Sequence, residues 1–222
     1  MGEVSEAYRG LRTRVTDVVR TAPRDALDRV APATPEWRVR DVLAHLVGVP
    51  ADVLAGRLEG VATDAWTAAQ VDARRDRTVD ELLAEWQECG PQIEPVLEQV
   101  PFEVIGQAMY DAVTHEHDIR HALGAPGARD SDAFDLAWRW YVGARARGGA
   151  PALRFVTEAG ETVAGAGEPV ATIEAPRFEI FRAATGRRTA TEIAAFRWDC
   201  TPEPTLLLAA DIFTMRTEPL GE

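Results

Sequence analysis

The chain has 222 residues, enough for one large domain or for a main domain with a smaller companion, and its composition of 46% apolar and 27% charged residues is that of a globular protein. Its net charge of −12 argues against a nucleic-acid binder, because such proteins meet phosphates with basic surfaces. All 24 cationic residues are Arg, and the absence of Lys excludes a Schiff-base lysine, a lysine general base and a P-loop.

The sequence shows no signal-peptide pattern and no apolar run that approaches the length of a membrane span, so we expect a cytoplasmic protein. The two cysteines, Cys89 and Cys200, are too few for a disulfide scaffold or a four-thiolate zinc site. We therefore expect both thiols to be reduced and structural.

The first two thirds of the chain carry the apolar periodicity of helices. The predicted helices cover residues 3–22, 34–58, 78–100, 102–123 and 130–146. Thr34 is the expected N-cap of the second helix with Pro35 in its first turn, and Pro50 is expected to end or kink it. Thr78 and Glu81 have capping-box spacing, and Gly124 is the expected C-cap of the fourth helix. An antiparallel bundle is the natural packing for such a series.

The pattern changes after a small-residue linker at 143–152. Runs typical of short strands follow at 153–159, 161–167, 169–175 and 204–211, with helical patterns at 176–186 and 189–198. The sequence therefore predicts an α+β protein, in which a helical bundle at 1–147 is followed by a small α+β domain at 150–222.

Three of the four histidines lie in the stretch YDAVTHEHDIRHALG at 110–124. At about 100° per residue, His115 falls at the edge of the apolar stripe of the fourth helix, on the same row as Asp111 and Asp118. His117 and His121 project to the polar side, where we expect them to be in solvent; the alternative is that this i, i+4 pair binds a metal adventitiously. Asp118 can orient an imidazole or be a simple polar residue.

The fourth histidine, His45, lies at the border of the apolar stripe of the second helix. Two bundle helices can therefore present His45, Asp111 and His115 to one interior pocket. Two imidazoles and a carboxylate form an open zinc set, which also suits iron or nickel. The alternative is that each histidine is hydrogen-bonded to a neighbour at the edge of the core.

Three segments of the sequence resemble the mycothiol-dependent maleylpyruvate isomerase family, a branch of the DinB-like helical-bundle superfamily. EWRVRDVLAHL is similar to the family's first motif, DAVTHEHDIRHALG to its second, and PRFEIFRAATGRRTATEIAAFRWDCTPEP to its C-terminal domain. The resemblance covers essentially the whole chain. It implies a divalent metal, usually zinc, held by His45, Asp111 and His115, although the family's acidic ligand is usually the longer Glu.

The resemblance also implies mycothiol as thiol cosubstrate and a small electrophile as substrate. The expected activity is that of an isomerase or an S-transferase, in which a metal-bound thiolate attacks the electrophile. Without Lys, any counter-charge for a substrate carboxylate must come from Arg, and Arg120, Arg187 and Arg188 are the candidates in the motif regions. A non-catalytic binding module that keeps the fold and a metal-dependent hydrolase are the alternative functions.

Overall fold

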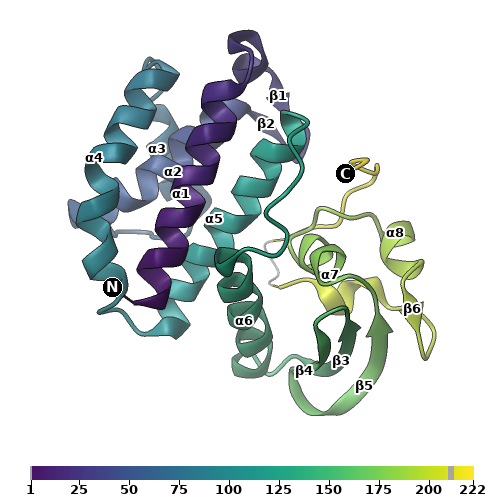
Figure 1. Cartoon of the computed structure of the whole chain (residues 1–222). Coiled ribbons are helices and arrows are strands. Elements are labelled where there is room, and N and C mark those ends of the chain that lie inside the picture. Colours follow the sequence, from purple (N-terminus) through teal and green to yellow (C-terminus); the bar gives the residue numbers. More distant parts are fainter. Residues whose placement is uncertain (1, 210–212) are drawn as a thin grey trace. The chain divides into compact units, whose positions relative to one another are not determined.

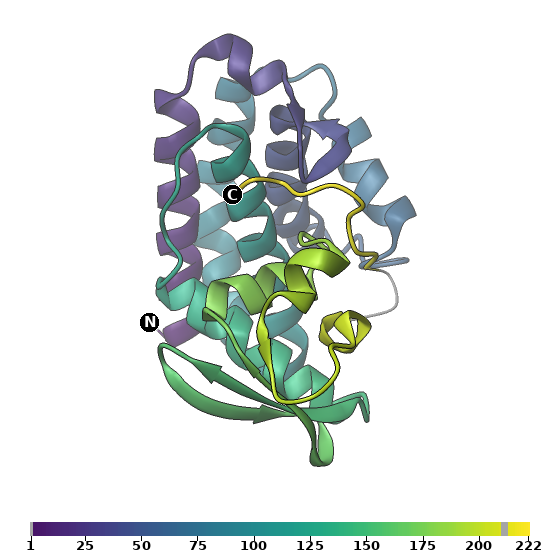
Figure 2. The same cartoon turned by 90° about the vertical axis from the view of Figure 1, so that its right-hand side faces the viewer.

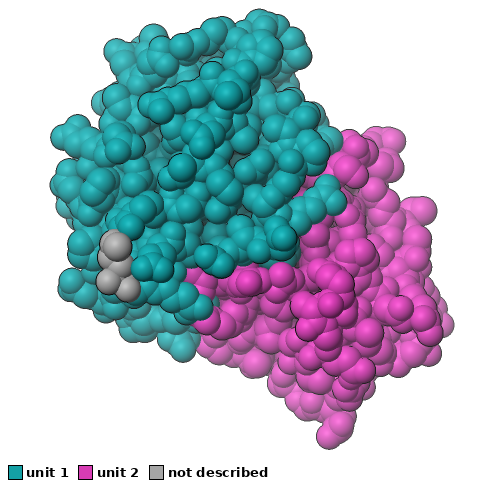
Figure 3. All heavy atoms as spheres, viewed as in Figure 1, with its two compact units in different colours: residues 1–134 teal, residues 135–222 magenta. Residues whose placement is uncertain are grey.

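The computed structural model describes residues 2–209 and 213–222 (Figure 1). By their internal contacts the residues form two compact units, unit 1 at Met1–Phe134 and unit 2 at Asp135–Glu222 (Figure 3). The division falls at the beginning of α6 (Asp132–Arg147), whereas the predicted domains separate at its end. Most of α6 groups with unit 2 because its side chains bond that unit's backbone: Tyr141 donates to the Leu207 carbonyl (2.8 Å), and Arg145 donates to the Pro151 carbonyl (2.8 Å).

Unit 1 is an antiparallel helical bundle, in agreement with the predicted fold class (Figure 1, Figure 2). Its elements are α1 (Glu3–Thr21), η1 (Arg24–Asp28), β1 (Val30–Ala31), β2 (Thr34–Arg38), α2 (Val39–Leu54), α3 (Asp64–Asp72), α4 (Val79–Leu97) and α5 (Phe102–Ala122). Helices α1, α2, α4 and α5 bury their apolar stripes against one another, and α3 packs on α2. Fully buried Leu11, Leu43, Leu82, Trp86 and Ile93 make the centre of this core.

The beginning of α2 differs from the prediction. Residues 34–38 form a strand whose Thr34 pairs with Ala31, so Thr34 is not an N-cap and Pro35 is not helical. Arg38 takes the N-cap position instead. Its backbone N–H donates a hydrogen bond to the Asp41 carboxylate (2.9 Å). Pro50 lies inside α2 without ending it.

Other predicted helix ends are confirmed. Thr78 caps α4, since its hydroxyl accepts from the Glu81 N–H (3.3 Å) and the Glu81 carboxylate accepts from the Thr78 N–H (2.7 Å). Helix α5 gives way at its C-terminus to Gly124, whose φ of +62° is the left-handed conformation of a helix terminator. Helix α3, which is capped by Thr63, has a weak apolar pattern and was not predicted.

Unit 2 combines a small sheet with short helices (Figure 1). Its elements after α6 are β3 (Pro151–Thr157), β4 (Gly160–Ala164), β5 (Ala166–Glu174), α7 (Arg177–Ala184), α8 (Ala190–Ala194), β6 (Arg197–Trp198) and η2 (Pro204–Leu207). The strand order is β4-β3-β5-β6, with β3 parallel to β5 and the other pairs antiparallel. This agrees with the predicted α+β character.

The strand predicted at 204–211 is wrong over the residues that the structure describes. Pro204–Leu207 is a 3-10 helix, and residues 210 and 211 lie outside the described residues. The carbonyl of Leu207 accepts from Tyr141 rather than from a neighbouring strand. Within the described part of the chain, no helix combines the length and apolarity that a bilayer crossing requires.

Candidate metal centre

Three side chains from two helices of unit 1 meet at one point. His45 lies on α2, while Asp111 and His115 lie one turn apart on α5. The Asp111 carboxylate reaches Nε2 of His45 through Oδ2 (3.0 Å) and Nε2 of His115 through Oδ1 (3.5 Å). The structure thus brings together the three residues that helical periodicity placed in a shared pocket, and one donor atom from each lies within 4.8 Å of the others.

The two imidazoles are buried, and each has a polar partner at its Nδ1. His45 is 2% exposed and His115 8%, whereas the Asp111 side chain is 40% exposed. Nδ1 of His45 contacts Oε1 of Gln70 (2.8 Å), and Nδ1 of His115 contacts Oδ2 of Asp118 (3.1 Å). Each ring therefore turns its Nε2 toward Asp111, which is the arrangement in which ligating histidines are oriented by a partner on the other nitrogen.

Asp118 and Trp37 complete the surroundings of the imidazoles. Asp118 is 0% exposed, so of its two sequence interpretations the structure supports the one in which it orients His115. The Trp37 ring, which comes from β2, lies 5.5 Å from the His45 ring and 5.8 Å from the His115 ring between centroids. The β1–β2 hairpin, which includes residues that were predicted to be helical, thus places an aromatic side chain beside both imidazoles.

The charges at the centre favour an ionised Asp111. Burial by itself would raise the pKa of the Asp111 carboxyl, but the neighbouring charges of His45 and His115 outweigh it and hold that pKa well below its ordinary value. Burial would likewise lower the pKa of His115, but the carboxylates of Asp111 and Asp118 outweigh that effect and raise the pKa to about 9. A cation entering the centre would therefore meet an anionic oxygen and displace a proton from His115.

The donor atoms lie close enough together for their spacing to be compared with that of the ligands of a small divalent metal. With bonds of about 2.0–2.1 Å at tetrahedral angles, neighbouring ligand atoms lie about 3.3–3.4 Å apart. The distances from Asp111 to the two imidazoles lie on either side of that value, 3.0 Å from Oδ2 to His45 and 3.5 Å from Oδ1 to His115. Asp111 thus reaches both histidines by directing one carboxylate oxygen at each of them, and one donor atom from each of the three residues lies within 4.8 Å of the others.

An apolar cavity of about 70 Å³ borders Asp111 inside the bundle. Its other lining side chains come from α1, α2, α4, the α4–α5 loop and α5, and include Leu46, Val53, Ile93 and Met109. None of its lining side chains is cationic, so a substrate carboxylate would find no counter-charge in it.

The prediction that His117 lies in solvent is wrong. His117 is 3% exposed and its ring lies 6.1 Å from that of Phe134, while His121 is half-buried. The prediction assumed one apolar stripe on α5, but almost the whole circumference of the helix is covered between Met109 and Ile119.

The three candidate arginines already have internal partners. Arg120 donates to the Glu116 carboxylate (3.0 Å) and the Ala125 carbonyl (3.1 Å). In unit 2, buried Arg188 binds the carboxylates of Glu179 and Glu222 (both 2.6 Å), and buried Arg187 donates to the Thr185 carbonyl (2.6 Å). Of the three, only Arg120 belongs to the same compact unit as the candidate centre. A catalytic role for any of them stays a prediction.

Sequence reasoning missed Gln70. It lies on the unpredicted α3, is 1% exposed and contacts His45 directly. A single Gln in a weakly patterned segment carries no chemical signal in the sequence. The sequence cues to its helix are confined to the N-terminus, where Thr63 is the capping residue and Asp64 stands in the first turn.

Residues 8–104 match the family model described as "Mycothiol maleylpyruvate isomerase N-terminal domain". The N-terminal domain of the chain belongs to this family. The match includes His45 and ends before Asp111 and His115, so the motif resemblance on α5 is independent of it.

Two solved structures share the fold of this chain over most of its length. Both are of a mycothiol-dependent maleylpyruvate isomerase, an enzyme, one of them a histidine-to-alanine mutant. The mutant matches with a TM-score of 0.62 at 12% identity, and the second structure with a TM-score of 0.59 at 13% identity. Each match covers 91% of this chain and 94% of the other. No curated protein matches the sequence significantly.

Proposed function

We propose that the protein is a divalent-metal-dependent and mycothiol-dependent isomerase or S-transferase that acts on a small electrophilic substrate. The observation that carries this proposal is the convergence of His45, Asp111 and His115, with each imidazole Nε2 facing the same carboxylate. The N-terminal family match and the fold shared with an isomerase support the thiol and the reaction class. Zinc is the expected metal, with nickel and iron as alternatives.

His45, Asp111 and His115 would hold the metal as three protein ligands and leave one position open. When bound, the metal supplies positive charge that lowers the pKa of a thiol, so that thiolate is present at neutral pH. Asp111 contributes a single negative charge, which leaves the centre attractive to an anionic sulfur. Burial of both imidazoles excludes water from their side of the centre.

The chemistry of the sulfur determines the reaction class. In an isomerase the thiolate adds to one carbon of a conjugated cis double bond, and the electron pair of that bond moves toward the conjugated carbonyl. Rotation then occurs about the resulting single bond, and return of the electron pair restores the double bond and expels the thiolate. In an S-transferase the carbon–sulfur bond remains in the product, after addition or after displacement of a leaving group. Arg120 is the candidate in unit 1 for pairing with a substrate carboxylate, and its present bond to Glu116 would have to open.

The test combines metal analysis and thiol titration on one sample. We expect about one divalent metal per chain after reconstitution, and its loss in His45→Ala and His115→Ala. His121→Ala is the matched control, because His121 lies on α5 outside the centre. Absence of stoichiometric metal from the wild-type protein would refute the proposal.

Calorimetric titration with mycothiol then separates the candidate functions. Metal-dependent binding of the thiol supports the isomerase or S-transferase. Intact metal with no thiol binding supports the non-catalytic module. Turnover of an ester or amide without added thiol supports the hydrolase, for which the open three-ligand set is also suited because a metal activates water.

A further inference from the structure

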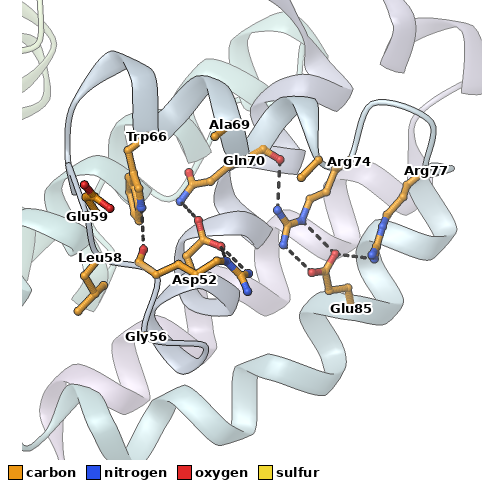
Figure 4. Close-up of a pocket in the computed structure, with 12 residues that line it drawn as sticks. Asp52, Gly56, Leu58, Glu59, Trp66, Ala69, Gln70, Arg74, Arg77 and Glu85 are labelled. Carbon is orange, nitrogen blue, oxygen red and sulfur yellow. Dashed lines mark hydrogen bonds and ion pairs between the residues drawn. The ribbon is translucent and has the colours of Figure 1, made fainter.

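A chain of four hydrogen-bonded side chains runs from the surface of unit 1 to the candidate metal centre. Arg57 donates through Nε to Oδ1 of Asp52 (2.8 Å), and Nε2 of Gln70 donates to Oδ2 of the same carboxylate (3.0 Å). Oε1 of Gln70 in turn contacts Nδ1 of His45 (2.8 Å). Figure 4 shows the amide of Gln70 directed at Asp52.

Arg57 and Asp52 determine which group donates and which accepts in each of these hydrogen bonds. Arg57 can only donate, and the carboxylate of Asp52, which forms an ion pair with it (2.6 Å), can only accept. The amide nitrogen of Gln70 must therefore face Asp52, which leaves its oxygen to face His45. Because an amide oxygen can only accept, Nδ1 of His45 carries a hydrogen. Nε2 of the same ring lies 3.0 Å from the Asp111 carboxylate and is the nitrogen that is left to bind a metal in exchange for its hydrogen.

The local packing shows that this contact is built into the fold. His45 and Asp52 are seven residues apart on α2, which places them on one face about 10.5 Å apart along the axis. Gln70 on α3 lies against this face and bridges them; Gln70 is 1% exposed and Asp52 7%. Between them stands Gly48, where an added Cβ would lie 2.6 Å from Cβ of Gln70. Only Gly at this position lets α3 come close enough.

We infer that Gln70 is a positioning residue of the metal centre, and that Asp52 and Arg57 hold it in the one orientation that directs Nε2 of His45 at the metal. This inference rests on the proposed metal site. Arg57, the outermost of the four hydrogen-bonded side chains, lies at an open cavity of about 670 Å³ between α2 and α3. Its side chain is 61% exposed there. The orientation of His45 inside the bundle thereby depends on the Arg57–Asp52 ion pair at its surface.

The first test removes or reverses the inner contact. Gln70→Leu keeps a similar volume and deletes the acceptor, and we expect zinc affinity to fall about 10- to 100-fold. Asp52→Asn keeps the shape but lets the amide of Gln70 turn over, so that its nitrogen faces Nδ1 of His45. We expect a loss of affinity of similar size and a changed absorption spectrum of bound cobalt(II). Gln92→Leu, at an exposed glutamine of α4, is the matched control and should bind like the wild type.

The second test restores the direction with different atoms. In the double variant Gln70→Glu with Asp52→Asn, the new carboxylate can only accept from His45 and the new amide can donate to it. We expect zinc affinity and the cobalt spectrum to return to within about threefold of the wild type. A purely structural role of Asp52 predicts no such rescue. The inference is overturned if Gln70→Leu binds zinc within twofold of the wild type, or if the folded double variant binds as weakly as Asp52→Asn alone.

A readout without metal separates this inference from the proposed function. Nitrogen-15 NMR of the metal-free wild-type protein should show a hydrogen on Nδ1 of His45, and Asp52→Asn should lose it. If the wild-type protein bound neither zinc nor cobalt, the proposed function would fail. The hydrogen-bond direction would still be upheld or refuted by the NMR spectrum alone.

Discussion

Replacing Gly48 by Ala gives the most direct test of how α2 and α3 fit together. In an exposed helix interior the change stabilises a protein by about 1 kcal/mol, because Gly has the greater conformational entropy to lose. At Gly48 the added Cβ would lie 2.6 Å from Cβ and 2.9 Å from Cγ of Gln70. Both atoms are close to the backbone of α3, so the helix itself has to move.

The expected cost follows from these contacts. Overpacking of this kind costs about 1–3 kcal/mol, and displacing Gln70 weakens two hydrogen bonds that contribute about 1 kcal/mol each. After the gain in helix propensity, we expect Gly48→Ala to lower the free energy of unfolding by about 1–3 kcal/mol. Zinc affinity should fall as well, because Gln70 orients His45.

Urea denaturation of the metal-free protein measures the first effect. Gly10→Ala is the matched control: Gly10 lies inside α1, and its added Cβ would meet only the flexible end of Arg14, at 3.2 Å. This control should be neutral or stabilising. A Gly48→Ala variant as stable as the wild type, with unchanged zinc affinity, would refute the reasoning about α3.

Three further predictions concern unit 1. Thr78→Ala removes the N-cap of α4 and should lower the free energy of unfolding by about 1 kcal/mol in urea; an unchanged midpoint would contradict the capping role. Glu116→Ala leaves the Arg14 guanidinium without the buried carboxylate that now binds it (2.8 Å), and should cost about 2–4 kcal/mol. The double variant in which Arg14 is also changed to Met should recover part of this loss, and no recovery would argue against the pair. In the metal-free protein, the stability contributed by His115 is complete below its ordinary pKa of 6.5 and is lost as pH rises through about 9, so urea stability should fall on the order of 3 kcal/mol between about pH 6 and pH 10. His115→Gln should show a smaller fall, and equal slopes would refute the assignment.

Helical periodicity was sufficient to place the three candidate ligands. His45, Asp111 and His115 lie at the borders of apolar stripes, and the packing of α2 against α5 then follows from burying those stripes. The same rule failed for His117, because the rule assigns one solvent-exposed face to each helix. A helix covered on nearly all sides breaks that assumption, and only the tertiary packing reveals it.

Other features depended on contacts between distant segments. Thr34 and Pro35 are acceptable in a first helical turn, but pairing with Val30–Ala31 draws them into a strand. The short α3 has no apolar stripe to detect, and its close approach to α2 depends on Gly48 of that helix. Gln70 was therefore beyond prediction, although its Oε1 lies 2.8 Å from Nδ1 of His45.

The position of Trp37 allows the candidate centre to be followed by intrinsic fluorescence. Its indole lies within 6 Å of both imidazoles between ring centroids, so its emission should respond to their protonation and to whatever binds between them. A paramagnetic ion such as cobalt(II) should quench this indole, whereas zinc, with its filled shell, should not. The chain has 6 Trp residues, and subtracting the spectrum of Trp37→Phe would isolate the signal of this one. The protein thus carries an intrinsic fluorophore with which occupancy could be followed in a cuvette, without a label.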